Sequence, residues 1–397
     1  MHTGELLHNY AWRKIYGILS GILTDRDNYM RAFTLDPVTA AKTISEFAEI
    51  KDAAGLGDVA AKNAIIDCYI KIMDSGLFPD IDILLDDAVN FVEIQKNNIY
   101  ILYEMLLFDG NFTYWLRKYG NGYEFNEEHL SAAISDKIAL GDLIKSFSTQ
   151  HSKKRFVANI IYAMAYGQDC VESLLHQDIN EVGILNKNYI YIVYYGRKIR
   201  LPFLSFENDG VILNIQKKTV QNSAVNFDRQ NPIIVTAKNN SNRVSVAGYD
   251  VTPGESAHYY NERIFNLKCI SLEDMRDRYQ TINSEIYKLL CFNQRGKGSF
   301  LVTGSDMGVG KSTFLLSMLE KCPAHWGIGI LDPQNEMQMS NKYPNKNVIT
   351  LVENEQKDLS ECFSYLLDVY KRQDIRISRC CLQSQHITMS ALMICWE

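Results

Sequence analysis

The chain lacks any pair of cysteines in the C-x-x-C spacing that zinc sites and redox motifs use, although it contains nine cysteines. Six of them are scattered singly, and the other three, Cys380, Cys381 and Cys395, lie close to the C-terminal end. We therefore expect reduced, mostly buried thiols rather than disulfides or a zinc site.

A long apolar run is also missing. The most apolar stretch, Ile99–Phe108, is interrupted by Glu104 and is far shorter than the ~20 residues that cross a bilayer. The start of the chain carries no apolar segment typical of a signal peptide. These two observations predict a cytoplasmic protein without a membrane span of its own.

The chain has fewer basic than acidic residues, with 41 Lys and Arg and 47 Asp and Glu, which gives a net charge of −6. Proteins that follow a phosphate backbone usually carry a basic face, so we expect no nucleic-acid partner. The 397 residues are 46% hydrophobic and 22% charged, which is typical of a folded protein with two or three domains.

A glycine-rich segment near the C-terminal end is the most informative feature that is present. It starts with the apolar stretch Ser299–Val302 and enters an amphipathic helix at Lys311–Leu319. The loop that joins them and the first turn of the helix contain the candidate binding residues Gly304, Ser305, Asp306, Met307, Gly308, Val309, Gly310, Lys311, Ser312 and Thr313.

This order is that of a phosphate-binding loop, G-x-x-x-x-G-K-[ST], in which backbone N–H groups and the helix start surround a phosphate. Lys311 would reach the terminal phosphates and Ser312 would ligate Mg²⁺. The first glycine of the motif should fall at Ser305, whereas this chain has it one residue earlier, at Gly304. A glycine turn that merely joins a strand to a helix is the alternative, but Gly-Lys-Ser-Thr at a helix start favours ATP binding.

Residues 1–150 are expected to be mainly helical, because apolar residues recur at helical spacing through Ala40–Ile50, Asp58–Met73 and Ala88–Phe108. We find no catalytic constellation there. The many tyrosines and the Trp115 region favour packing over a platform for stacked bases. The region is interpreted as a helical docking or interaction region of unknown role.

An α+β domain is predicted over residues 153–270. Its expected elements are a helix at Arg155–Tyr166, a helical piece running to Gly183, and strands at Asn188–Arg197, Ile199–Phe206, Ile233–Ala237 and Arg243–Ala247. The segment 250–261 contains Pro253 and Gly254 and is expected to be a loop or hinge.

Residues 271–370 are predicted to form an α/β domain of alternating helices and strands. Ser271 is expected to be a helix N-cap, followed by a helix through Asn283–Phe292 and the strand of the glycine-rich segment. Further strands are expected at Trp326–Leu331 and Val348–Val352, and a helix at Asp358–Tyr370. This alternation predicts a parallel sheet and an α/β P-loop (RecA-like) ATPase core.

The order of these pieces resembles the secretion ATPases of the type II/IV superfamily, most closely the tight-adherence (Flp) pilus assembly branch. The resemblance runs from residue 153 to about residue 370. Counterparts of the family's weak motifs are Leu174–Val182, Tyr191–Arg197, Asn242–Val244, Glu262–Phe265 and Ser271–Met275.

The resemblance implies a homo-hexameric motor that hydrolyses ATP, with Mg²⁺, between its N-terminal and P-loop domains. Such a motor powers pilus assembly or protein secretion across the inner membrane. It would lie at the cytoplasmic face of the membrane and associate peripherally through an inner-membrane platform protein.

The resemblance also carries roles for four residues outside the loop. Arg243 and Arg263 would close over the nucleotide and supply charge to its γ-phosphate, as arginine fingers do. Asp332 and Glu336 match the family's acidic box, with Asp332 in place of the usual Glu, and Asp332 would help Ser312 to hold Mg²⁺ or orient the attacking water. The alternatives are structural salt bridges for the two arginines and a solvated loop carboxylate for Asp332. Asp332 is expected at the end of a strand beside the P-loop strand, where α/β sheets place ligand-binding groups.

The pattern stops after Tyr370, where the family has a Walker B strand ending in Gly-Glu and a histidine-containing box. The tail, residues 371–397, offers no convincing strand into an acidic pair, and His386 alone is interpreted as incidental. We expect that the chain is a fragment whose own sequence ends near Asp368–Gln373. Whether it hydrolyses ATP without these elements is an open question.

Two other functions stay open. The loop Thr303–Met307 followed by Gly-Lys-Ser-Thr also resembles the mismatch-repair ATPases, which act on DNA, although this likeness covers little beyond the loop. The other alternative is a nucleotide-binding interaction protein that does not hydrolyse ATP.

Overall fold

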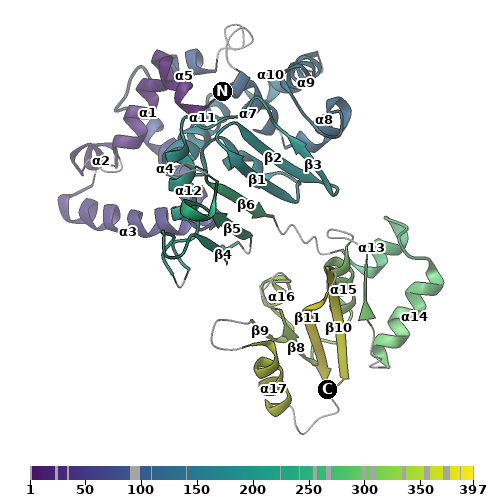
Figure 1. Cartoon of the computed structure of the whole chain (residues 1–397). Coiled ribbons are helices and arrows are strands. Elements are labelled where there is room, and N and C mark those ends of the chain that lie inside the picture. The colour runs from purple at the N-terminus through teal and green to yellow at the C-terminus, as the bar shows by residue number, and fades with distance from the viewer. Residues whose placement is uncertain are drawn as a thin grey trace. The chain divides into compact units, whose positions relative to one another are not determined.

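The computed structural model divides into two units, Met1–Ile264 and Phe265–Glu397, and each has its own sheet and its own core (Figure 1). The residues described are 2–22, 26–33, 35–89, 99–108, 110–139, 141–223, 225–240, 242–253, 257–264, 270–296, 301–304, 310–332, 337–352, 358–369, 376–384 and 386–396.

The first part of unit 1 is helical, as the apolar spacing predicts. Its elements are η1 (Thr3–His8), α1 (Tyr10–Ile22), α2 (Arg26–Phe33), α3 (Pro37–Gly55), α4 (Val59–Asp74), α5 (Ile81–Ala88), α7 (Ile99–Phe108), α8 (Phe112–Tyr119), α9 (Glu127–Ala139), α10 (Asp142–Ser146) and α11 (Gln150–Ala165). Asp36 and Asp58 start α3 and α4, because each carboxylate accepts hydrogen bonds from two N–H groups of the first turn. The helices predicted within Ala40–Ile50 and Asp58–Met73 are confirmed.

A six-stranded antiparallel sheet forms the second part of unit 1, in the order β3-β2-β1-β6-β5-β4. Its strands are β1 (Glu181–Asn186), β2 (Tyr189–Tyr194), β3 (Arg197–Arg200), β4 (Ile233–Ala237), β5 (Arg243–Ala247) and β6 (Tyr259–Arg263). The short helices η2 (Asp169–His176) and η3 (Tyr249–Val251) and the helix α12 (Asp209–Thr219) complete the unit.

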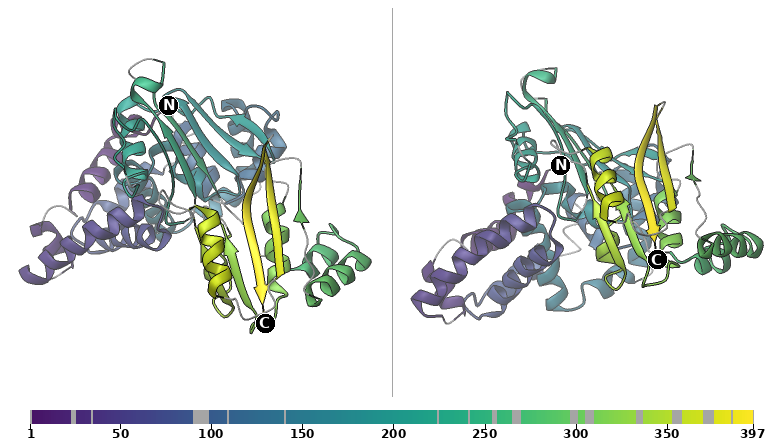
Figure 2. Two further views of the ribbon diagram at one scale, coloured as in Figure 1. Left: turned by 60° about the horizontal axis from the view of Figure 1, so that its bottom comes forward. Right: turned by 90° about the horizontal axis from the view of Figure 1, so that it is seen from below.

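The two faces of this sheet differ in burial. Alternate residues such as Val182, Ile184, Val244 and Val246 are almost fully buried and belong to the same hydrophobic core as Trp12, Ile65 and Phe156 of the helices. The helices of unit 1 gather on this side of the sheet (Figures 1 and 2). Because side chains alternate along a strand, the other face carries half-exposed polar residues, among them Glu181, Arg243 and Arg263.

Several boundaries in unit 1 differ from the sequence-based expectation. The helical piece predicted up to Gly183 ends at His176, and β1 begins at Glu181 because this segment pairs between β2 and β6. The strand predicted over Ile199–Phe206 ends at Arg200, shortly before Pro202, which has no N–H to donate. Tyr259–Asn261, expected within a loop or hinge, lie in β6 near the middle of the sheet. The strands Ile233–Ala237 and Arg243–Ala247 are confirmed.

Unit 2 contains α13 (Leu272–Asp277), α14 (Ser284–Arg295), β7 (Leu301–Val302), α15 (Lys311–Glu320), β8 (Gly327–Leu331), α16 (Met339–Lys342), β9 (Asn347–Leu351), α17 (Leu359–Val369), β10 (Arg376–Ser384) and β11 (His386–Trp396). The helix start predicted at Ser271 is confirmed, because Ser271 and Asp274 cap each other's backbone N–H groups. Leucines of α15 pack on the isoleucines of β8 and form a core of their own.

The sheet of unit 2 has the order β7-β10-β11-β8-β9. Pairing is parallel between β7 and β10 and between β8 and β9, and antiparallel around β11, so β7, β8 and β9 run in the same direction. The tail therefore forms a strand pair that lies between β7 and β8, and, as the sequence predicts, neither of these strands ends in an acidic pair. None of the described helices combines the length and apolar composition that a membrane span needs.

Candidate functional site

The helix predicted to follow the phosphate loop is present as α15, which begins at Lys311. Gly310 is its N-cap and has a φ of 91°, in the left-handed region that favours glycine. The Lys311 side chain is buried, and its Nζ donates to the carbonyl oxygen of Gly304 at 3.4 Å. The ammonium group therefore lies against the first residue of the loop. Ser312 and Thr313 occupy the first turn of α15 and are half-buried.

Part of the predicted loop lies outside the described residues. This applies to Ser305, Asp306, Met307, Gly308 and Val309, and also to Glu336 of the acidic box. Their roles stay predictions.

Asp332 directly follows β8 and is buried. Its Oδ2 accepts a hydrogen bond of 2.8 Å from the N–H of Met337, and its own N–H donates to the carbonyl oxygen of Leu351 at 3.0 Å. Because β7 and β8 are parallel, Asp332 and Gly304 lie at the same edge of the sheet, the edge at which α/β proteins bind ligands. The prediction that Asp332 follows a strand beside the P-loop strand is wrong, however, because β10 and β11 separate β8 from β7 by three strand spacings, roughly 14 Å.

The structure brings Arg243 and Arg263 together. They are directly opposite each other on β5 and β6, and Arg263 is in turn opposite Glu181 on β1. Directly opposed residues share a face with their Cβ atoms about 5 Å apart, so the three side chains form a row. Arg263 Nε lies 3.7 Å from Glu181 Oε2. The row thus contains two guanidinium groups and one carboxylate, an arrangement that suits an anion such as a phosphate.

Hydrogen bonds hold Glu181 in this row. Its Oε1 accepts from Asn261 Nδ2 at 2.6 Å and from the Tyr191 hydroxyl at 3.2 Å. The Tyr191 ring lies across Gly183, where a Cβ atom would come within 2.1 Å of it. Lys198 Nζ lies 3.9 Å from the centre of the same ring. Glycine at position 183 therefore creates the space that lets Tyr191 reach Glu181.

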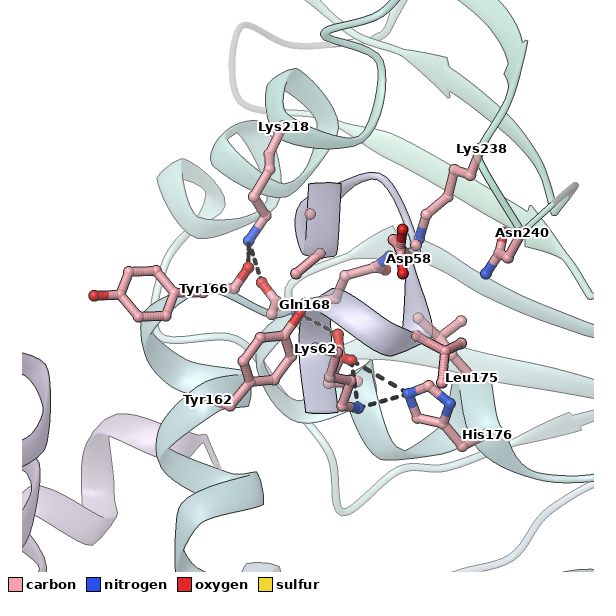
Figure 3. A pocket seen from close by; sticks show the side chains of 16 residues that line it. Asp58, Lys62, Tyr162, Tyr166, Gln168, Leu175, His176, Lys218, Lys238 and Asn240 are labelled. Carbon is pink, nitrogen blue, oxygen red and sulfur yellow. Dashed lines mark hydrogen bonds and ion pairs between the residues drawn. The ribbon is translucent and has the colours of Figure 1, made fainter. Parts of the chain in front are cut away.

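A second group of charged side chains lies inside unit 1, and nothing in the sequence predicts it (Figure 3). Lys62 Nζ donates to Glu172 Oε1 at 2.8 Å and contacts His176 Nε2 at 2.6 Å. Lys218 Nζ donates to the carbonyl oxygen of Tyr166 at 2.7 Å. The cavity between these residues is about 20 Å³, which is room for one water molecule.

The electrostatics of this group indicate a structural role. Burial raises the pKa of Glu172 and of Glu262, but Lys62 and Lys238, with hydrogen bonds, outweigh it and hold both pKa values below the usual range. Burial lowers the pKa of Lys218 to about 8. The ionised pair of Lys62 and Glu172 ties α4 to η2 and so joins the helices to the segment before the sheet. Its members lie 110 residues apart and form no motif, so no sequence signal identifies them.

The hydroxyl of Ser312 and the carboxylate of Asp332 are oxygens of the kind that Mg²⁺ prefers. The strands that precede the loop and Asp332, β7 and β8, are separated by β10 and β11, so their joint role at one metal ion stays a prediction. Within the described ranges, no group of three or more His, Cys, Asp or Glu side chains could hold a metal ion by itself.

No family model matches the chain, and no curated protein matches it. Among solved structures, it is similar to the VirB11 ATPase from the Brucella suis type IV secretion system, crystallised in complex with sulphate, with 11% sequence identity and a TM-score of 0.21. The match covers 48% of this chain and 60% of that chain, so it spans less than two thirds of the neighbour. A likeness of this size carries no argument about function, so the function has to be inferred from the residues of this chain.

Proposed function

We propose that the chain is an ATP-binding motor ATPase that powers pilus assembly or protein secretion across the inner membrane. The observation that carries the proposal is the entry into α15. There a left-handed Gly310 precedes the buried Lys311, whose ammonium group contacts the carbonyl oxygen of Gly304. A helix start with a lysine at this place provides N–H groups, a positive dipole end and a positive charge for phosphates.

In this proposal, residues 304–313 surround the phosphates of ATP and Lys311 contacts the terminal ones. Ser312 and Asp332 provide oxygen ligands for Mg²⁺, which neutralises phosphate charge when it is bound. The buried Asp332 is already oriented by the N–H of Met337. Glu336 is proposed to act with Asp332 on the attacking water.

Arg243 and Arg263 are proposed to supply charge to the γ-phosphate. Like charges directly opposite each other across two strands repel, and these two guanidinium groups are opposed in register. A phosphate would add a second anion to this row, in which the Glu181 carboxylate already lies 3.7 Å from Arg263.

The order of motifs, which resembles that of the secretion ATPases, also supports a proposal for the oligomeric state and the cellular location. We propose a homo-hexamer at the cytoplasmic face of the inner membrane, held there by an inner-membrane platform protein. Residues 1–150 and their role in docking are part of the same proposal.

The test is ATP turnover by the full chain, measured together with the oligomer mass with and without nucleotide. We expect an ATP-dependent increase in mass and turnover, both lost in Lys311→Ala. Lys288→Ala is the matched control, because Lys288 is an exposed lysine on α14 and should leave both unchanged.

The other outcomes separate the alternatives. Nucleotide binding without turnover would favour a motor that lacks its Walker B strand if a longer chain forms a ring and hydrolyses ATP, and a non-hydrolysing interaction protein if it does not. Turnover that depends on added DNA would favour a DNA-acting ATPase and would contradict the motor proposal.

A further inference from the structure

A cluster of tyrosines and cations covers one part of unit 1 that the nucleotide assignment does not use. We define it as the tyrosine–arginine surface, with Arg117 of α8, Tyr123, and Tyr195 and Arg197 of the β2–β3 hairpin. Tyr123 and Tyr195 are 80% and 77% exposed. The Arg117 guanidinium lies 5.7 Å from the centre of the Tyr195 ring.

The members are contiguous because three chain segments meet here. The carbonyl oxygen of Tyr123 accepts a hydrogen bond of 2.8 Å from the N–H of Arg200 in β3. A Cβ atom on Gly122 would lie 3.3 Å from Arg197 Nη1. The loop before α9 therefore borders the edge strand of the sheet, and α8 borders the hairpin turn.

The hairpin turn holds Tyr195 in an unfavourable backbone conformation. Tyr195 and Gly196 join the paired residues Tyr194 and Arg197 and have φ values of 48° and 72°. Such a two-residue turn needs positive φ at both positions, which glycine, asparagine and aspartate accept most easily. A bulky tyrosine is strained there, and its exposed ring adds little to the core. Strain of this kind clusters at functional sites, and it points to a use for the ring at the surface.

The charge of the surface is unbalanced. Arg117 and Arg197 are exposed, and in the described part of the chain neither of them forms an ion pair with a carboxylate. The neighbouring Lys118 differs, because it is paired with Asp136. A local excess of cations on a chain of net charge −6 is complementary to a partner rich in carboxylates.

The rings favour a protein partner. Tyrosine and arginine are the residues enriched at protein interfaces and at their energetic centres. A nucleic-acid partner is disfavoured by the net charge of −6 of the chain. The defined members include no aliphatic side chain that could insert into a lipid surface. We propose that the tyrosine–arginine surface is a docking site for an acidic segment of a partner protein.

The experiment is the fluorescence anisotropy of a labelled oligoglutamate peptide titrated with the full chain at low salt. We expect saturable binding that weakens as salt is added, and a loss of about tenfold in affinity for Tyr195→Asn. The double variant Arg117→Ala/Arg197→Ala should lose at least as much. Tyr10→Asn is the matched control, because Tyr10 is 60% exposed, has Lys14 Nζ 5.7 Å above its ring, and lies on α1.

Thermal unfolding separates a lost contact from a lost fold. Because asparagine accepts the left-handed conformation, Tyr195→Asn should melt at or above the wild-type temperature while it binds the peptide more weakly. Unchanged affinity in both surface variants would overturn the proposal. So would tighter binding of a single-stranded oligonucleotide or of anionic vesicles that the same variants abolish, or a change of oligomer mass in these variants, which would make a second copy the partner.

Discussion

Glu262→Gln removes the negative charge from a fully enclosed ion pair of unit 1. The Glu262 side chain has no exposed surface, and its oxygens accept from Lys238 at 3.1 and 3.2 Å and from Asn242 at 2.7 Å. Gln168 donates to the same carboxylate at 2.9 Å. Glutamine fits the same space and can accept some of these bonds, but it leaves the buried ammonium group of Lys238 without a counter-charge.

Removing one partner of a buried ion pair costs about 3–5 kcal/mol of unfolding free energy. Since glutamine keeps the shape, we expect the lower end, about 3 kcal/mol, or a fall of roughly 6–12 °C in Tm. The pH dependence has a defined sign. Lys238 outweighs burial and lowers the pKa of Glu262, so its stabilisation is present above the unfolded pKa of about 4.3 and is lost on acidification. Glu262→Gln should lack this contribution.

The assay is urea denaturation followed by the fluorescence of Trp12 and Trp115, in a background in which Trp326 and Trp396 are replaced by Phe. Adding Lys238→Met to Glu262→Gln should recover most of the loss, because no uncompensated charge is left. Glu181→Gln, at a half-exposed site on the other face, should cost less than about 1 kcal/mol. A cost below about 1 kcal/mol for Glu262→Gln, or no recovery in the double variant, would refute the reasoning.

Three further variants test other features. Burial raises the pKa of Glu104 to about 7, so the folded state keeps a proton that the unfolded chain releases, and unit 1 should lose stability as the pH rises from about 4.5 to 7. Glu104→Gln should flatten that part of the curve of urea midpoint against pH, and an unchanged slope would contradict the assignment. Gly183→Val should cost about 1–3 kcal/mol, because its Cβ would meet the Tyr191 ring, and the same change in a Tyr191→Ala background should cost clearly less in the same assay. Gly310→Ala forces a side chain into the left-handed region and should lower ATP affinity in a titration with a fluorescent ATP analogue, whereas wild-type affinity would count against a strained loop.

The parts of the fold that could be predicted are those with local signals. The strands at Ile233–Ala237 and Arg243–Ala247 have β-branched residues on both sides of a polar turn, and Ser271 has its capping partner three residues away. Local signals give the wrong secondary structure where pairing with distant strands determines it. The segment that begins at Glu181 forms β1 because β2 and β6 lie on both sides of it, and neither neighbour is visible in its own residues.

In the candidate site, too, local sequence predicts some features, and others depend on strand pairing. The sequence identifies Lys311 at a helix start and Asp332 at a strand end, and both lie where those elements place them. It names Arg243 and Arg263 separately, but their position opposite each other depends on the register of β5 and β6. The strand pair between β7 and β8 depends on pairing over long sequence separations, which no local pattern contains.

The most direct test of ATP binding at the α15 helix start is equilibrium titration of the full chain with ATP and Mg²⁺, measured by isothermal titration calorimetry. We expect saturable binding with one ATP per chain, at least about tenfold weaker in Lys311→Ala and unchanged in Lys288→Ala. Equal affinity of the wild-type protein and Lys311→Ala, or no measurable binding by the wild type, would contradict the proposed nucleotide site.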